Sequence, residues 1–242
     1  MLKINHFTKT YGEKKAVDDL SLHIQAGEIY GFIGHNGAGK TTTLKSVAGI
    51  MQFDSGEILV DGVSMKADPI ACKKKIAYIP DNPDLYDFMT GIQYLNFVGN
   101  VFGVPAQERS RRIQELGEAF ELTADLTQSI GSYSHGMKQK LALIGALIHK
   151  PKLLILDEPF VGLDPAASLT LKQKMHELCE NGSAVFFSTH VLDVAEKLCN
   201  KVVIIKNGRL VAAGDTGELT GGASLESVFM EVTCDDKADS IS

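Results

Sequence analysis

The sequence has no excess of positive charge. Its 242 residues include 24 lysine and arginine against 30 aspartate and glutamate residues, a formal net charge of −6 at pH 7. A nucleic-acid-binding surface needs a basic face or stripe, and the densest basic stretch here is only Lys73-Lys74-Lys75. We interpret this short run as a solvated surface turn and expect no nucleic acid among the partners.

Cysteines are few, and no apolar run is long. The four cysteines form no CxxC pair, so neither a zinc site nor a disulfide framework is expected from their spacing. Apolar stretches such as 141–148 fall well short of the ~20 residues that cross a bilayer. The opening MLKINHFTKTYG lacks the apolar core of a signal peptide. We therefore expect a cytosolic chain with reduced thiols, which works at a membrane only through another chain.

Apolar patterning predicts an α/β fold. A composition of 44% hydrophobic and 22% charged residues is ordinary for a globular protein. Periodicity and turn residues predict strands at 20–24, 28–33, 55–60, 76–79, 152–156, 184–187, 202–205 and 209–213, and helices at 40–48, 134–149, 165–179, 191–198 and 225–232. Between these segments, residues 81–133 show helical spacing throughout, which predicts an inserted helical subdomain. We expect one domain over 2–230 and a frayed polar tail over 231–242.

A glycine-rich segment carries the first chemical motif. GHNGAGKT, from Gly34 to Thr41, matches G-x-x-x-x-G-K-[ST] and stands between a predicted buried strand and a predicted helix. In such a loop, backbone N–H groups and the helix N-terminus bind phosphate. Lys40 is expected on the β- and γ-phosphates and Thr41 on Mg²⁺. The expected ATP-binding loop is Gly34, His35, Asn36, Gly37, Ala38, Gly39, Lys40, Thr41 and Thr42.

Two acids follow a second buried strand. In LLILDEP, Asp157 is placed to hold Mg²⁺ through water, as Walker-B aspartates do. Glu158, one residue later, is placed to act as general base on the attacking water. Together with the glycine-rich loop, these acids predict a P-loop NTPase.

The segment before the strand that ends in these two acids indicates which family of P-loop NTPases the sequence resembles. Residues 133–137 read YSHGM, which resembles the LSGGQ signature of ABC-type ATPases. Ser134 and Gly136 match the signature, whereas His135 and Met137 replace its first glycine and its glutamine. The resemblance implies that Ser134 and Gly136 contact the phosphates of ATP bound to a second, head-to-tail copy or to a paired ABC ATPase.

Further elements extend the resemblance over residues 2–230. VGLDP at 161–165 resembles the D-loop, His190 resembles the catalytic switch histidine, and Tyr11 resembles the aromatic residue that stacks on adenine. The resemblance implies the ABC ATP-binding domain. That architecture has a mixed, largely parallel sheet core, an N-terminal antiparallel β subdomain and the inserted helical subdomain.

The sequence departs from the family pattern at one position close to the expected Mg²⁺ site. The family pattern Tyr-x-Pro-Gln reads Tyr78-Ile79-Pro80-Asp81 here, so an anion replaces a neutral amide. We expect Asp81 to reach Mg²⁺ or its water, close to Asp157. The combination of His135 and Asp81 resembles bacterial two-component ABC exporters, including the Ecs-type group, more than importers.

The resemblance implies an ATPase subunit at the cytoplasmic face of the membrane, attached through a separate transmembrane permease. The permease would dock beside Asp81 and the helical subdomain. Two alternatives stay open at this point. A soluble ABC ATPase of iron–sulfur cluster assembly would copurify with soluble scaffold proteins. A nucleotide-dependent interaction module would show little turnover despite an intact Glu158.

Overall fold

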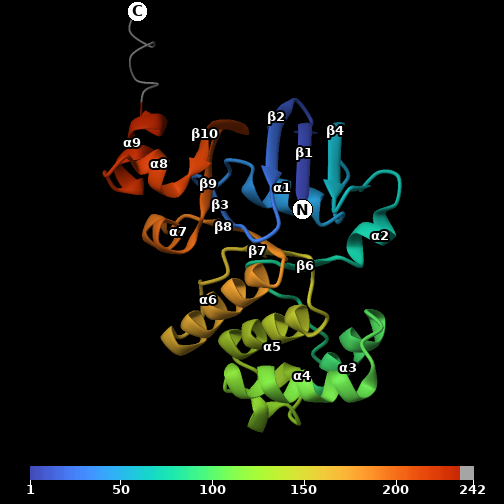
Figure 1. The fold of residues 1–242 in the computed structure, drawn as a ribbon. Coiled ribbons are helices and arrows are strands. Elements are labelled where there is room, and N and C mark those ends of the chain that lie inside the picture. The colour runs from blue at the N-terminus through green and yellow to red at the C-terminus, as the bar shows by residue number, and fades with distance from the viewer. Residues whose placement is uncertain (235–242) are drawn as a thin grey trace, which may run out of the picture.

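The computed structural model describes residues 1–234 as two sheets with helices packed around them (Figure 1). The antiparallel sheet has the order β2-β1-β4-β5, and the larger sheet has the order β10-β9-β3-β8-β7-β6, parallel except for β10. The strands are β1 Leu2–Tyr11, β2 Lys14–Ile24, β3 Ile29–Ile33, β4 Ser55–Val60, β5 Val63–Ser64, β6 Ile76–Ile79, β7 Leu153–Asp157, β8 Ala184–Thr189, β9 Lys201–Lys206 and β10 Arg209–Asp215.

Helices occupy the space below and beside the sheets. In Figure 1 the inserted helices α3 and α4 lie lowest, with α5 and α6 between them and the six-stranded sheet. The helices are α1 Lys40–Val47, α2 Pro69–Lys73, α3 Gly91–Val101, α4 Ala106–Ala119, α5 His135–Ile148, α6 Pro165–Glu180, α7 Leu192–Leu198, α8 Thr216–Thr220 and α9 Leu225–Cys234. Within residues 1–234, no helix has the length and apolar character needed to span a membrane.

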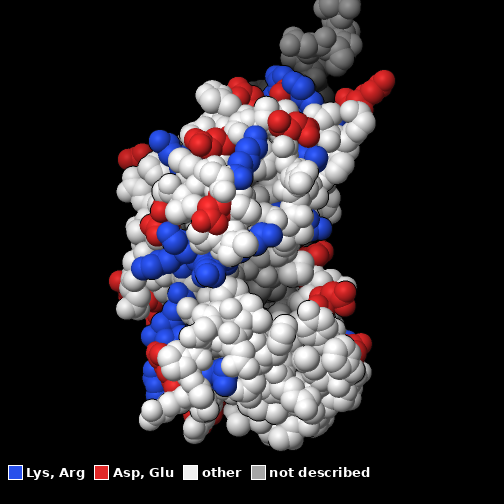
Figure 2. All heavy atoms as spheres, turned by 90° about the vertical axis from the view of Figure 1, so that its right-hand side faces the viewer, with Lys and Arg blue, Asp and Glu red and all other residues white. Residues whose placement is uncertain are grey.

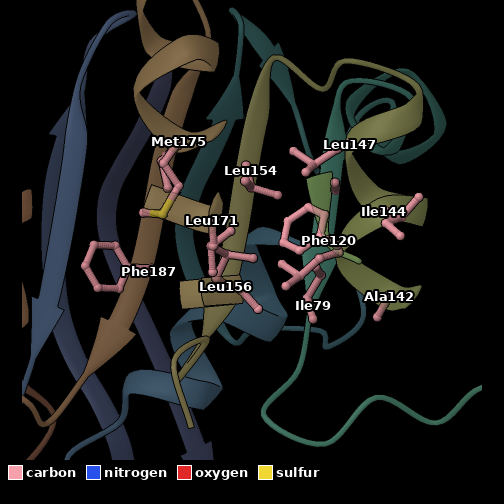
Figure 3. Close-up of a cluster of buried hydrophobic side chains, with 14 of the residues drawn as sticks. Ile79, Phe120, Ala142, Ile144, Leu147, Leu154, Leu156, Leu171, Met175 and Phe187 are labelled. Atoms are coloured by element: carbon pink, nitrogen blue, oxygen red, sulfur yellow. The ribbon is translucent and has the colours of Figure 1, made fainter. Parts of the chain in front are cut away.

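The central strands are apolar at every position because both faces of the sheet are covered. Alternate residues of β7 enter opposite cores: Leu154 and Leu156 pack toward α5 and α6, whereas Leu153 and Ile155 belong to the core that includes α1. Figure 3 shows the first of these cores, where Phe120 at the end of α4 lies among side chains of α5 and β7. This core fixes the inserted helices against the sheet.

The register of the parallel strands sets the position of the site. Asp157 of β7 pairs with Ser188 of β8, and Thr189 pairs with Ile33 of β3. The carboxyl ends of β3, β7 and β8 therefore meet at one edge of the sheet. The glycine-rich loop, the two acids and the switch histidine all follow directly from these strand ends.

The expected fold class is confirmed, but several elements differ, and strands β1 and β5 are absent from the expected strands. Helices α2 and α8 have five residues each, too few for a periodic signal, so the sequence pattern did not predict them. Helix α9 continues to Cys234, so the expected domain boundary at 230 falls inside it. The rest of the expected tail, 235–242, lies outside the described residues.

Candidate functional site

The glycine-rich loop has the backbone conformation of a phosphate cradle. Gly37 and Gly39 have φ angles of +79° and +110°, which favour glycine. A Cβ atom on Gly39 would lie 2.5 Å from the carbonyl oxygen of Ala16. Gly39 also precedes α1 without any side-chain cap. Because the first N–H groups of a helix have no intrahelical partner, they are available to an anion at this loop.

Lys40 is a buried cation at the bottom of this loop. Its side chain is 6% exposed, and its Nζ atom donates a hydrogen bond of 2.6 Å to the carbonyl oxygen of Gly34. Nζ also lies 3.7 Å from Oε1 of Glu158. Burial lowers the pKa of Lys40 below its ordinary value, against the charges of Glu158 and Asp157, which raise it. A buried ammonium held this way suits a polyanionic ligand.

Ser188 connects the two acids of the site. Its side chain is fully buried, and its Oγ donates a hydrogen bond of 2.5 Å to Oδ1 of Asp157. The same Oγ accepts a hydrogen bond of 3.0 Å from the backbone N–H of Glu158. Glu158 has a φ of +48°, a left-handed conformation that costs a non-glycine residue roughly 1 kcal/mol. The serine hydroxyl therefore holds both acids in place.

The two oxygen atoms of the Glu158 carboxylate face different side chains. Oε1 faces Lys40, whereas Oε2 lies 3.0 Å from Nδ1 of His190 and 3.3 Å from its backbone nitrogen. His190 is 56% exposed, and it also lines an adjoining hollow of about 290 Å³ beside Gly34 and His35. His190 and Glu158 therefore meet within hydrogen-bonding distance.

Most of the predicted site residues line one pocket, which has a volume of about 280 Å³. It is lined by Tyr11, Lys14, Ala16, His35, Asn36, Gly37, Gly39, Lys40, Thr41, Thr42, Asp81, Asp157 and Glu158. The pocket lining does not include Gly34 and Ala38, whose carbonyls bind Lys40 and the N–H of Gly208 respectively.

The hairpin of β1 and β2 supplies one wall of this pocket. Tyr11 is the last residue of β1, and its ring is about half exposed, with the hydroxyl 2.7 Å from Sδ of Met51. Lys14 and Ala16 of β2 line the pocket as well. The sequence reasoning missed both, because no motif marks them and only the hairpin brings them to the loop.

Ser134 and Gly136 lie outside the lining of this pocket. The Oγ of Ser134 caps α5 by accepting a hydrogen bond of 3.3 Å from the N–H of Met137. A Cβ on Gly136 would lie 3.1 Å from the carbonyl oxygen of Gly162. In a single chain the signature segment thus packs against the D-loop rather than the glycine-rich loop.

Gln139 is a further residue that the sequence reasoning missed. It is 1% exposed, and its Nε2 donates a hydrogen bond of 3.3 Å to the carbonyl oxygen of Pro159. This contact joins α5 to the segment that follows the two acids. The pattern of the sequence gives no signal for it, because the two residues are 20 positions apart.

The residues at the pocket fit a nucleotide with Mg²⁺. A buried lysine and a glycine cradle suit phosphate, while Thr41, Asp157 and Asp81 put one hydroxyl and two carboxylates on the same pocket. Among residues 1–234, no group of three or more histidine, cysteine, aspartate or glutamate side chains is arranged to hold a metal. A small set of protein ligands is usual for Mg²⁺, which keeps waters and takes phosphate oxygens.

Comparison with known proteins decides the family. The family described as ABC transporter matches residues 17–161. The chain belongs to the ABC transporter family. It is 42% identical over 219 residues to the uncharacterized ABC transporter ATP-binding protein YxlF of Bacillus subtilis, covering 90% of this chain and 72% of the relative.

Two further similarities agree with this assignment. The ABC-type transporter ATP-binding protein EcsA of Bacillus subtilis is 32% identical, over 98% of both chains. A solved structure described as the ATP-binding subunit of an ABC transporter superposes with a TM-score of 0.93 at 34% identity, covering 96% of this chain and 99% of that one. This chain is thus an ATP-binding and ATP-hydrolysing subunit of the ABC transporter family, and the resemblance seen in its motifs is confirmed.

Proposed function

We propose that MgATP binds in the pocket beside Lys40, with the adenine on the exposed ring of Tyr11. Lys40 and the N–H groups of the glycine-rich loop, residues 34–42, would bind the β- and γ-phosphates. Mg²⁺, when bound, would neutralise phosphate charge, and Thr41, Asp157 and Asp81 are the residues positioned to hold it or its waters. The observation that carries this proposal is the meeting of Lys40, Asp157 and Glu158 at one pocket.

Glu158 is the base in this proposal. Water attacks the γ-phosphorus, the bond from that phosphorus to the ADP oxygen breaks, and the water proton passes to Glu158. His190 orients the Glu158 carboxylate through its contact at Oε2. When phosphate takes over as the counter-charge of Lys40, Oε1 is released to face the water.

The position of the signature segment favours a dimer. Because Ser134 and Gly136 do not line the pocket of their own chain, a second copy or a paired ABC ATPase would have to present them. A head-to-tail pair would enclose two ATP molecules. Hydrolysis would then remove the phosphate charge that both chains contact and open the interface.

A groove beside β6 is the proposed docking site for a membrane permease. Its volume is about 430 Å³, and its lining, which includes Ile79 and Phe102, is largely apolar. The hydroxyl of Tyr78 is buried there and has no hydrogen-bond partner among the described residues. Helix α3 contains no charged residue, and Figure 2 shows a wide uncharged surface over the lower part of this face.

Exposed apolar side chains continue the groove onto the surface. Phe88 is 81% exposed and Val101 is 63% exposed. Large apolar patches on a soluble domain mark interaction sites. A helical segment of a separate permease would cover this surface and place the chain at the cytoplasmic face of the membrane. The departures at His135 and Asp81 resemble bacterial two-component ABC exporters more than importers, so export is the proposed direction.

The proposal is tested by identifying a neighbouring gene for a protein with several transmembrane helices and coexpressing that protein with the chain. The pair should be extracted together from the membrane fraction and should hydrolyse MgATP. In inside-out vesicles, an exporter should accumulate its substrate in the lumen. Copurification with soluble scaffold proteins instead would support the assembly-type alternative.

A further inference from the structure

Five lysines from two distant segments gather beside the permease groove. Lys73, Lys74 and Lys75 lie at the end of α2 and the start of β6, and Lys150 and Lys152 lie between α5 and β7. The backbone joins the two segments, because the N–H of Lys152 donates a hydrogen bond of 2.8 Å to the carbonyl oxygen of Lys75. We call these five residues the lysine patch.

Most of the patch is exposed and forms no ion pair with the described residues. Lys73, Lys74, Lys150 and Lys152 are exposed, and none of them forms an ion pair or side-chain hydrogen bond with any described residue. Lys75 alone is paired, at 2.7 Å from Asp61. Lys75, and Lys152 to a smaller extent, lower the pKa of Asp61. Glu115 and Glu177 line a hollow together with Lys150 and Lys152, but neither acid forms an ion pair with these two lysines.

The patch borders the apolar groove directly. Ile76 follows Lys75 and His149 precedes Lys150, and both of these neighbours line the groove. At the other end, a Cβ on Gly49 would lie 2.9 Å from Cε of Lys73, next to Ile50 of the groove lining. Figure 2 shows lysine and arginine side chains gathered to the left of the middle, immediately above the uncharged lower surface.

We propose that the lysine patch binds anionic phospholipid headgroups of the bilayer around the permease. This inference rests on the proposed function, which puts the groove against a membrane protein. Exposed cations beside an apolar surface are the pattern of proteins that bind the negative cytoplasmic leaflet. The net charge of −6 opposes approach to such a membrane, so local positive charge is needed to orient this face toward it.

The size of the effect follows from the number of lysines. Each lysine close to an anionic surface strengthens binding by about fivefold, and the effect fades within a Debye length. Four lysines without an ion-pair partner thus give weak but measurable binding at low salt. The headgroups would hold the chain in register with its permease while nucleotide opens and closes the dimer.

Flotation with lipid vesicles tests the patch on the full chain. Vesicles of phosphatidylcholine mixed with phosphatidylglycerol should carry the protein at about 0.1 M salt and release it near 1 M salt, where screening is short-ranged. The Lys73→Gln/Lys74→Gln variant should lower the partition constant at least about tenfold, and adding Lys150→Gln and Lys152→Gln should reduce it to the value for pure phosphatidylcholine. A matched variant, Lys3→Gln/Lys197→Gln, removes the same charge elsewhere and should change partition less than about twofold.

Two results would overturn the proposal. The first is equal flotation of wild-type protein with neutral and anionic vesicles. The second is normal vesicle binding by the fourfold variant, and loss of its permease in that case would assign the lysines to an acidic permease loop. ATP hydrolysis measured on the same samples should be unchanged, so failure of the lipid proposal is distinguished from failure of the proposed function.

Discussion

The ammonium of Lys40 lies 3.7 Å from the Glu158 carboxylate, so the proposed phosphate-binding cation and the proposed base neutralise each other. Both side chains are largely buried, which strengthens their attraction relative to a pair in water. A γ-phosphate must replace Glu158 as the partner of Lys40. The exchange would free the base only when the nucleotide is present.

Replacing Lys40 should abolish tight nucleotide binding. In Lys40→Ala, the glycine cradle keeps its N–H groups but loses the charge that offsets the phosphates. Charge-assisted contacts contribute about 1.5–3 kcal/mol each, so we expect affinity for MgATP to fall by roughly 10- to 100-fold or more. Isothermal titration measures this directly. Lys45→Ala on the same helix, which does not line the pocket, is the control, and near-normal affinity in Lys40→Ala would exclude the assigned role.

Replacing Glu158 should separate binding from turnover. Glu158→Gln keeps the shape of the side chain but cannot take a proton, so hydrolysis should slow by about 10²–10⁴ while MgATP still binds. The variant should accumulate as a dimer in MgATP, which light scattering detects. Glu180→Gln, exposed at the end of α6, should behave as wild type. A monomer in saturating MgATP would count against the head-to-tail arrangement.

Asp81→Gln should shift the Mg²⁺ dependence of hydrolysis. The Asp81 carboxylate attracts the metal and repels the γ-phosphate, and each interaction reaches a few kcal/mol at an effective dielectric of ~20. Removing the charge changes both of these interactions. We expect the affinity for nucleotide in the absence of metal to change less than the Mg²⁺ dependence of hydrolysis. Asp84→Asn makes the same charge change in the groove rather than the pocket. If the Mg²⁺ titrations of Asp81→Gln and wild type coincide, Asp81 lies away from the metal.

Ser188→Ala should affect both stability and the metal site. The change leaves the N–H of Glu158 without its partner and frees the Asp157 carboxylate, at a cost of about 1–3 kcal/mol. Tm should fall by several degrees, at about 2–4 °C for each kcal/mol, and more Mg²⁺ should be needed for half-maximal hydrolysis. Ser183→Ala removes another buried hydroxyl, which donates to Pro151, and should lower Tm alone. Equal Mg²⁺ curves for the two variants would contradict the role of Ser188.

His149 should make the folded state sensitive to mild acid. It stacks on Phe102 with ring centroids 3.7 Å apart, and burial, with a smaller contribution from Arg112, lowers its pKa to about 4. In the unfolded chain the histidine has a pKa near 6.5, so it binds a proton at pH values where the histidine of the folded protein stays neutral. Stability is therefore complete above about pH 6.5 and is lost as the pH falls toward 4, by roughly 2 kcal/mol at pH 5.

Urea unfolding at pH 7.5 and pH 5 measures this loss. His149→Phe keeps an aromatic ring against Phe102 but cannot titrate, so its stability should fall less than that of wild type between the two values. His6→Phe, at an exposed histidine, should leave the wild-type difference unchanged. An identical pH dependence for wild type and His149→Phe would show that His149 is protonated in the folded state.

The motifs and the family could be predicted from the amino-acid sequence, because their signals are local. Gly34 to Thr41 needs only its own residues and its flanking strand and helix to form a phosphate loop. Asp157 and Glu158 likewise follow a strand that is apolar at every position. Their order along the chain, with Ser134 before them and His190 after them, was sufficient to identify an ABC ATPase.

Which distant residues share a surface could not be predicted from the sequence, because it depends on how the segments pack in the folded chain. Strand register sets Ser188 opposite Asp157, 31 positions away, and the β1–β2 hairpin brings Lys14 to the pocket. From the sequence, Lys73, Lys74 and Lys75 are an ordinary solvated turn; they become part of a larger patch because β6 pairs with β7 and draws Lys152 beside Lys75. Hydrophobic periodicity predicts which face of a segment is buried, but it does not predict which other segment packs against that face.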